Sequence, residues 1–467
     1  MCSGSLLRGM IAFAVPIILT GILQLLYSAA DQIVVGQFAE NKNAFAAVGA
    51  TSSLTSAFVN IFVGISGGGC ICVAQYYGAR DGKNVSETVH TCVLISLICG
   101  VVVAIIGFIF CKPVLVMMGT PEDILDLSTM YMRIMFVCQP FSLFYNFASG
   151  ILRATGDTKR PFYIMVFTGA LNVVLNLIFV ICFKMDVDGV GYATLIGAIL
   201  NALIAARILT TSDDSIRVNI KDLKIHWDKV GKIMSYGLAS GLQSFLFSIS
   251  NVIIQSSVNT LANLESGVLV GSTYVKGVSV VGGNSASSSI EGFIYMSMNA
   301  IAQAQLNFTG ANLGARNYKR VDKSLLTGLG IVTVVGGLMG AAALLFKVPL
   351  LSIYQPKDAD AVLYGTTRLM IVGSTYFICG IHDVMISALR GIGSSWAPTI
   401  ISVASVGGVR VMWLLFVFPH FLTPLMLYVA WPLTWISALV LLVISYLTTK
   451  KKYFAKNEAQ YTTVADA

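Results

Sequence analysis

Charged side chains are scarce in this chain of 467 residues, at 11% of the total, whereas apolar residues reach 56%. Soluble domains carry about 25% charged residues, so roughly half of the usual charge is missing. This shortage excludes a solvated globular surface. The apolar runs of about 20 residues that take its place are typical of membrane-spanning helices. We therefore expect an all-α integral membrane protein.

The motifs of several functional classes are also absent. The chain has no HExxH motif and no paired aspartates on facing helices, which argues against an intramembrane enzyme. Its nine cysteines fall mostly in apolar segments without metal-ligand spacing to histidine, which argues against zinc and disulfides. No basic patch is interleaved with aromatic residues, and no filter-like loop repeats. We expect no cofactor, no nucleic-acid partner and no channel.

Twelve apolar segments are present instead, and the first is too long for a cleaved signal peptide. That segment also contains Pro16 and Asp31, so it is expected to remain as a helix. Loops rich in Gly, Pro, Asp and Lys separate the segments. The predicted spans centre near residues 10–37, 44–70, 89–111, 128–151, 161–183, 189–209, 232–260, 286–308, 324–346, 361–388, 397–419 and 423–447.

The distribution of basic residues predicts the topology. Most of the 30 Lys and Arg residues fall in segments that would be cytoplasmic if both termini were cytoplasmic, chiefly residues 80–83, 153–160, 207–232, 316–323 and 450–456. Cytoplasmic loops carry an excess of Lys and Arg. We therefore predict a multi-pass protein of a bacterial inner membrane with both ends in the cytoplasm. The net charge of +8 is then explained by insertion bias and by contact with anionic lipids of the bilayer.

The two halves of the chain share a weak repeat. Gly78-Ala79-Arg80 matches Gly314-Ala315-Arg316, and the pairs Leu152-Arg153 and Leu389-Arg390, Arg133 and Arg368, and Pro121 and Pro356 match in the same order. Six spans per half predict parallel repeats with the substrate site between them. A change in offset between the matches places an insertion in the outer loop near residues 263–285. We predict an N-lobe at 1–211, a cytoplasmic interfacial connector at 212–231, a C-lobe at 232–449 and a cytoplasmic tail at 450–467.

Ionisable groups inside a span are functional candidates, because burial in lipid is costly unless they are paired or hydrated. Asp31 is the clearest, and Gln24 and Tyr27 share its helix face. Asn172 and Asn176 lie four residues apart in the fifth span, and Thr194 follows in the sixth. A carboxyl among amides, shielded from water, could bind and release a proton. Two alternatives stay open, namely that Asp31 is a solvated residue at a helix end and that the asparagines only join helices.

The second half differs at the matching positions. Asn251 stands where the first half has Asp31, and the ionisable candidates are His382 and Asp383 in the tenth span. These two neighbours point about 100° apart on a helix and need not touch; pairing with Arg368 or Arg410 is the alternative. Asn146 occupies the equivalent place in the first half. Glu291, at the start of the eighth span, is expected at the interface.

Taken together, these motifs resemble the multidrug and toxic compound extrusion (MATE) family. The resemblance covers essentially all twelve spans. It rests on the L-R-x-x-G-x-x-x-x-P loops at residues 152–161 and 389–398, the two G-A-R loops, the first-span pattern from Pro16 to Asp31, and Asn172-x-x-x-Asn176 with Thr194. It implies a monomeric, V-shaped pair of six-helix lobes that export organic cations or amphipathic drugs in exchange for H⁺ or Na⁺.

The resemblance also assigns roles to residues. It makes Asp31 the coupling carboxylate, with Gln24, Asn146, Asn172 and Thr194 lining the cavity of the N-lobe. Many relatives have Asp where this chain has Asn176, so a Na⁺ site near Asp31 is less secure and H⁺ coupling is favoured. The family acid of the tenth span aligns with Cys379, one turn before Asp383, which suggests a shifted C-lobe site. A related flippase for lipid-linked saccharides, or an exporter of other amphiphilic metabolites, is the alternative function.

Overall fold

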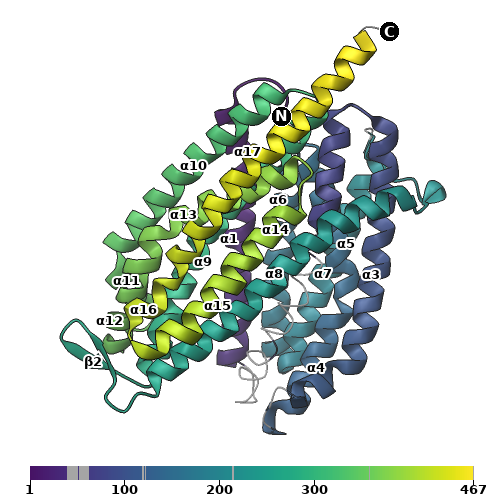
Figure 1. Cartoon of the computed structure of the whole chain (residues 1–467). Coiled ribbons are helices and arrows are strands. Elements are labelled where there is room, and N and C mark those ends of the chain that lie inside the picture. Colours follow the sequence, from purple (N-terminus) through teal and green to yellow (C-terminus); the bar gives the residue numbers. More distant parts are fainter. Residues whose placement is uncertain are drawn as a thin grey trace. The chain divides into compact units, whose positions relative to one another are not determined.

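The computed structural model describes residues 1–38, 51, 63–117, 120, 122–212, 215–356 and 358–465, and these residues are almost entirely helical. Helices satisfy their own backbone hydrogen bonds, which the interior of a bilayer requires. The predicted second span, residues 44–70, lies largely outside the described residues. The chain divides into two compact units, residues 15–244 and residues 1–14 with 245–467. We call them the 15–244 unit and the 245–467 unit, after their main segments (Figure 1).

The 15–244 unit contains most of α1 and the beginning of α8, because the division falls inside both helices. Between them lie a helix of residues 63–78 and four further spans. Its elements are α1 (Leu6–Phe38), α3 (Gly82–Met117), α4 (Glu122–Val137), α5 (Gln139–Ala154), α6 (Lys159–Leu177), the π-helix η1 (Ile178–Cys182), α7 (Val187–Thr211), the 3₁₀-helix η2 (Ile220–Asp222) and α8 (Trp227–Ala262).

The 245–467 unit contains the remaining elements, including a short antiparallel hairpin in the predicted outer insertion, with Val268 opposite Val275. Its strands are β1 (Val268–Val270) and β2 (Thr273–Val275), and its α-helices are α9 (Val278–Gly314), α10 (Tyr318–Leu345), α11 (Lys347–Tyr354), α12 (Ala359–Arg368), α13 (Ser374–Gly391), α14 (Trp396–Ser402), α15 (Arg410–Met412), α16 (Pro424–Tyr428) and α17 (Ala430–Ala465). The π-helices η3 (Leu369–Gly373), η4 (Val403–Val409) and η5 (Trp413–Val417) and the 3₁₀-helix η6 (Phe418–His420) interrupt them.

The predicted spans correspond to these helices with three differences. Among the described residues, nine helical segments are long and apolar enough to cross a bilayer, and α4 with α5 makes a tenth that bends by 43°. Pro140 lies in the first turn of α5, and proline lacks the N–H that would continue the helix. The predicted eighth span is α9, which is more polar because it carries residues such as Asn284 and Glu291. The last helix, α17, extends to Ala465, so the predicted tail is helical almost to its end.

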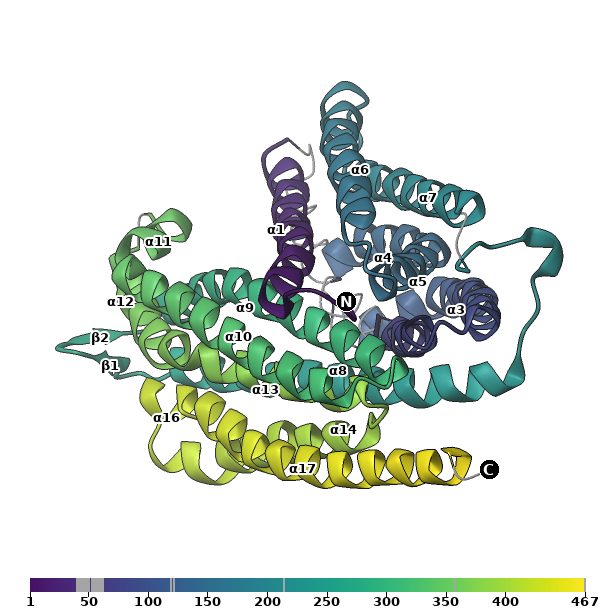
Figure 2. The same cartoon turned by 90° about the horizontal axis from the view of Figure 1, so that it is seen from above.

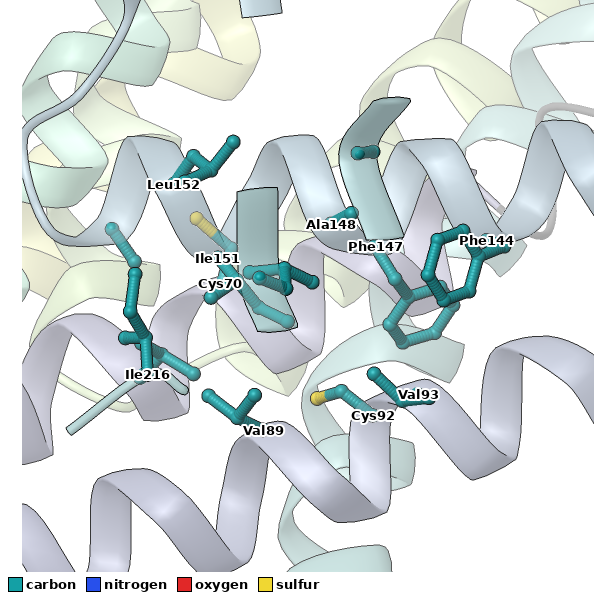
Figure 3. Close-up of a cluster of buried hydrophobic side chains, with 14 of the residues drawn as sticks. Cys70, Val89, Cys92, Val93, Phe144, Phe147, Ala148, Ile151, Leu152 and Ile216 are labelled. Carbon is teal, nitrogen blue, oxygen red and sulfur yellow. The ribbon is translucent and has the colours of Figure 1, made fainter. Parts of the chain in front are cut away.

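The core of the 15–244 unit lies where the helix of residues 63–78, α3 and α5 meet. Cys70, Val89, Cys92, Phe147 and Ile151 are buried there with their neighbours (Figure 3). The cysteines are free thiols and serve as small apolar side chains, as the sequence predicted. The connector after α7 covers one end of this core with buried Ile216 and Val218.

Glycines allow the helix of residues 63–78 to approach α8 closely. A side chain at Gly64 would overlap the backbone of Gly241, and one at Gly68 would overlap Gly237. The two pairs are each spaced by four residues, so they form matching stripes on the two helices. Small residues in such stripes let membrane helices pack backbone to backbone. This contact joins the start of α8 to the 15–244 unit.

The repeated loops have the same backbone geometry in both units. Arg80 and Arg316 each have a φ of 57°, a left-handed conformation that is uncommon for residues other than glycine. Gly156 and Gly393 have φ values of 100° and 97°, which explains the glycine in both L-R-x-x-G loops. The matching motifs therefore encode matching turns.

Candidate functional site

Asp31 and Asn176 are in direct contact in the 15–244 unit. The Asn176 side-chain amide donates a hydrogen bond from Nδ2 to Asp31 Oδ1 at 2.5 Å and also points to Asn172 Oδ1 at 3.3 Å. Asn172 and Asn176 lie on one face of α6, as their spacing predicted. Asp31, from α1, is only partly exposed, and Asn176 is fully buried. The structure thus brings together three of the predicted coupling residues.

Asn176 retains unused hydrogen-bonding capacity. Its Oδ1 atom is buried and accepts no hydrogen bond among the described residues. Buried polar atoms without a partner are rare in folded proteins, so each calls for an explanation. An amide oxygen beside a carboxylate can accept a hydrogen bond from a protonated carboxyl or contribute to coordination of a small cation. Both possibilities are compatible with an ion that binds and leaves.

A second contact between α1 and α6 lies one turn before Asp31. The Tyr27 hydroxyl donates a hydrogen bond to the Val166 carbonyl at 3.4 Å. The Tyr27 ring occupies the space over Gly169, where any side chain would overlap it. Figure 2 shows α1 and α6 facing each other. Gly169 therefore allows α1 to approach α6. This contact helps to fix the position of Asp31 along the helix axes relative to Asn176.

The π-helix η1 begins two residues after Asn176. A π-turn carries an additional residue in the helix and leaves backbone groups with altered partners, and such turns are frequent at functional sites. Asn176 therefore stands at a junction between α-helical and π-helical backbone.

Three predicted residues of the same unit are not part of this cluster. The Thr194 hydroxyl donates to the Val190 carbonyl of its own helix at 3.0 Å. Asn146 on α5 is half-buried, and Gln24 on α1 is exposed. Among the described residues, no hydrogen bond connects Thr194, Asn146 or Gln24 with Asp31. The common helix face of Gln24 and Asp31 did not mean a common environment.

Among the predicted residues of the second half, Asn251 is not part of a cluster, whereas the neighbours His382 and Asp383 are in contact. Asn251 lies on α8 with an exposed side chain. Asp383 is on α13, where its Oδ1 is 3.0 Å from Nδ1 of the buried His382. The two side chains thus contact each other, although adjacent helix positions do not require it. Among the described residues, no hydrogen bond or ion pair connects Asp383 with Arg368 or Arg410.

The structure reveals a buried ion pair in the 245–467 unit that the sequence did not predict. Arg368 donates to both carboxylate oxygens of Glu291, from Nε at 2.9 Å and from Nη2 at 2.7 Å. Its Nη1 donates to Asn284 Oδ1 at 2.6 Å, and the Tyr428 hydroxyl donates to the same oxygen at 3.0 Å. Glu291 is 3% exposed, so its expected interfacial position was wrong. An arginine inside an apolar span was the signal, because it requires a partner.

A second buried arginine in this unit has a different environment. Arg410 is 4% exposed. Its Nη2 donates to the Thr434 hydroxyl at 3.0 Å, and its guanidinium lies 5.1 Å from the centre of the Trp431 ring. Among the described residues, no carboxylate forms an ion pair with it. Its positive charge is therefore stabilised by the Thr434 hydroxyl and the face of the Trp431 ring, which is unusual for a buried charge.

Comparison with curated proteins shows relatives along nearly the whole chain. The sequence is 26% identical over 460 residues to the Probable multidrug resistance protein YoeA of Bacillus subtilis, covering 96% of this chain and 95% of that one. It is 22% identical over 409 residues to the Probable multidrug resistance protein NorM of Thermotoga maritima, covering 86% and 84%.

Solved structures have the same fold. An outward-facing multidrug resistance MATE family transporter of the MOP superfamily matches with a TM-score of 0.85 at 22% identity, covering 97% of both chains. A MATE structure in the bent conformation matches with a TM-score of 0.84 at 22% identity, covering 98% of this chain and 97% of that one. The protein therefore has the all-helical, twelve-helix MATE fold.

The MatE family model matches the chain twice, over residues 16–178 and 248–415. The two matches fall in the two halves that share the repeated loops, and together they cover more than half of the chain. This multi-pass membrane protein is a transporter rather than an enzyme, and it belongs to the MatE family.

Proposed function

We propose that this transporter exports cationic or amphipathic small molecules in exchange for H⁺ by alternating access. The observation that carries the proposal is the Asp31 carboxylate, which an asparagine amide holds between α1 and α6. Among the described residues, no cationic side chain forms an ion pair with Asp31. Its charge can therefore be neutralised by an exchanged ion. Relatives named multidrug resistance proteins support the substrate class.

Proton coupling is favoured over Na⁺ by the ligands present. Na⁺ is a hard cation that prefers several oxygen ligands, and a second carboxylate would strengthen its binding. The residue in hydrogen-bond contact with Asp31 is the neutral Asn176. A proton needs only the carboxylate and an acceptor, and the buried Asn176 Oδ1 can serve as that acceptor. A cationic substrate that approaches the carboxylate would displace the proton.

The exchange has a defined driving force. One monovalent cation exported for one H⁺ moves no net charge, so only the pH gradient drives it, by about 1.4 kcal/mol per pH unit. Exchange for two ions would add about 2.3 kcal/mol per 100 mV of membrane potential. We also propose, from the distribution of basic residues, that the protein lies in a bacterial inner membrane with both termini in the cytoplasm.

Efflux from proteoliposomes tests this function. Ethidium or a fluoroquinolone is loaded, and a pH gradient or a Na⁺ gradient is imposed separately. We expect the pH gradient alone to drive efflux in the wild type, and Asp31→Asn to abolish it. Asp123→Asn, an exposed carboxylate at the start of α4, is the matched control and should be active. Wild-type efflux by Asp31→Asn would remove Asp31 from the coupling role, and efflux driven only by Na⁺ would reject H⁺ coupling.

An anionic amphiphile is the second candidate substrate, either a lipid-linked saccharide moved by a flippase or another amphiphilic metabolite. The buried Arg410, without a carboxylate partner among the described residues, favours it. One relative, 22% identical over 380 residues, is named FAD transporter, from Shewanella oneidensis. Competition between FAD and ethidium in the same vesicles separates the classes, because inhibition by FAD that is lost in Arg410→Gln would support the anionic substrate.

A further inference from the structure

A pocket of about 540 Å³ lies in the 15–244 unit, away from the Asp31 cluster. Its walls come from α3, α4 and α7, which lie side by side in Figure 2. Phe108 and Met130 supply apolar surface, and Tyr192 adds a hydroxyl. Both apolar side chains are exposed. Exposed apolar side chains on a membrane span contact acyl chains, so the pocket belongs to the surface that meets lipid.

The pocket has one positive charge in excess. Lys112 and Asp126, which both line it, form an ion pair at 2.9 Å and neutralise each other. Arg133 also lines the pocket with an exposed side chain, and its guanidinium lies 5.0 Å from the centre of the Phe108 ring. Among the described residues, no carboxylate pairs with Arg133. It lies two turns further along α4 than Asp126, about 10 Å deeper.

The repeat shows that this arginine lacks its usual partner. Arg133 matches Arg368, which is buried and bound to both oxygens of Glu291. Glu291 belongs to the predicted eighth span, which precedes the second G-A-R loop. The matching segment of the first half, residues 44–70, ends before the first G-A-R loop and contains no Asp or Glu in its sequence. The first half therefore keeps the cation, but the segment that matches the eighth span has no carboxylate to pair with it.

A cation that has no carboxylate partner among the described residues is costly at this depth in lipid, and an anion from outside the chain would stabilise it. Guanidinium groups bind phosphate oxygens through two parallel hydrogen bonds. The apolar wall beside Arg133 suits an acyl chain, and the side chains of Arg133 and Lys112 can extend toward the headgroup level. A soluble anion would use the charge but not the apolar wall. The charge and the wall together match an anionic phospholipid.

We propose that this pocket binds an anionic phospholipid, with its phosphate at Arg133 and an acyl chain along Phe108 and Met130. The lipid supplies the negative charge that Glu291 supplies to Arg368 in the other unit. The site lies in the leaflet that contains the connection between α3 and α4. In the orientation proposed above, this is the outer leaflet.

Native mass spectrometry of the full-length protein tests the site. The protein is released from nanodiscs that contain equal amounts of phosphatidylglycerol and phosphatidylcholine, and the bound lipids are counted. We expect one phosphatidylglycerol to remain in preference to phosphatidylcholine. Arg133→Gln should lower this preference roughly tenfold, the value of one charged hydrogen bond. Arg133→Lys keeps the charge but loses the two-point contact with the phosphate, so it should retain only part of the preference. Arg160→Gln, an exposed cation in the first turn of α6, is the matched control and should behave as the wild type.

A photoactivatable phosphatidylglycerol locates the lipid. Cross-links should map to α3 and α4 peptides around Phe108 and Met130 in the wild type and disappear in Arg133→Gln. An unchanged lipid preference in Arg133→Gln, or cross-links elsewhere that do not respond to it, would overturn the proposal. Displacement of the lipid by inorganic phosphate in the wild type, but not in Arg133→Gln, would identify a soluble anion as the occupant and would equally overturn it.

Discussion

Arg368 and Glu291 form a two-point ion pair in the interior of the 245–467 unit, with both carboxylate oxygens bonded to one guanidinium. Asp31 in the 15–244 unit accepts its hydrogen bond from the neutral Asn176 instead. The Glu291 carboxylate is therefore neutralised within the protein, whereas the Asp31 carboxylate has no cationic partner among the described residues. This difference leads us to assign the ion exchange to Asp31 and a structural role to Glu291.

Removal of one partner of the buried pair should destabilise the protein. Glu291→Gln or Arg368→Met leaves the other charge buried without compensation, which costs about 3–5 kcal/mol. The double variant, Glu291→Gln with Arg368→Met, should recover much of this loss because no charge remains unpaired. Thermal unfolding in detergent measures the stability of the two single variants and of the double variant against the wild type.

A half-exposed pair provides the control for this prediction. Lys450 and Asp322 lie 2.7 Å apart, each with a side chain 34% exposed. Asp322→Asn should cost about 1 kcal/mol or less, because water screens such pairs. A loss in Glu291→Gln no larger than that in Asp322→Asn would show that the buried pair is dispensable.

A carboxylate in place of Asn176 should change the coupling ion. Asn176→Asp would put two acidic side chains in contact between α1 and α6, which provides more charged oxygen ligands for Na⁺. We expect efflux in this variant to be stimulated by an inward Na⁺ gradient that has no effect on the wild type. Asn176→Ala, which removes the donor to Asp31, should lose efflux under both gradients. Efflux by Asn176→Asp that is not stimulated by the Na⁺ gradient would contradict the proposed role of this position.

The sequence predicted the contact of Asp31 with the α6 asparagines better than its surroundings, for a physical reason. Asp31, Asn172 and Asn176 are polar groups in apolar helices, and a spacing of four residues places two of them on one face. Periodicity gives a common face but not what covers it, so it could not predict that Gln24 and Asn251 are exposed. The contact between Glu291 and Arg368 joins residues 77 positions apart. Such a contact depends on which helices pack together, and that information is tertiary.

The fold followed from the sequence wherever a local rule applied. Apolar length predicted the spans, and the glycines of the repeated loops predicted turns. The bend between α4 and α5 was missed because residues 128–151 form a continuous apolar pattern that hides the effect of Pro140. The contact of His382 with Asp383 was missed because it depends on side-chain rotamers and not on helix geometry.

A side chain at Gly169 should separate α1 from α6. Gly169→Val would overlap the Tyr27 ring, so α1 must move away, and the hydrogen bond between Asn176 and Asp31 should weaken. We expect efflux to fall by at least the roughly tenfold that one charged hydrogen bond contributes, with the protein still folded. Gly197→Ala is the control, because its new methyl group would make ordinary contacts with Asn172 Cβ at 3.9 Å and the Thr168 carbonyl oxygen at 4.0 Å. Equal efflux by the two variants would exclude this role for Gly169.

The turns before α3 and α10 differ in one chemical detail. Asp81 Oδ1 accepts from the Asn84 backbone N–H at 3.1 Å and caps α3. Asn317 occupies the matching place after the second G-A-R loop, and its Oδ1 accepts from the Arg320 backbone N–H at 3.2 Å. Both are good N-cap residues. Only the aspartate can change its charge with pH. Hydrogen bonds from the Asn84 side chain and backbone hold the pKa of Asp81 below its ordinary value.

This difference predicts a pH-dependent stability at one turn only. A lowered pKa means that the folded protein favours the charged form of Asp81. The resulting stabilisation is therefore complete above the ordinary pKa of about 3.9 and is lost as the pH falls through the lowered value. Thermal unfolding of the wild type and Asp81→Asn, measured from pH 7 downward, should show an advantage of the wild type that shrinks in acid. Asn317→Asp should create the same pattern at α10. A difference between the wild type and Asp81→Asn that stays constant across the pH range would show that the charge of Asp81 contributes nothing.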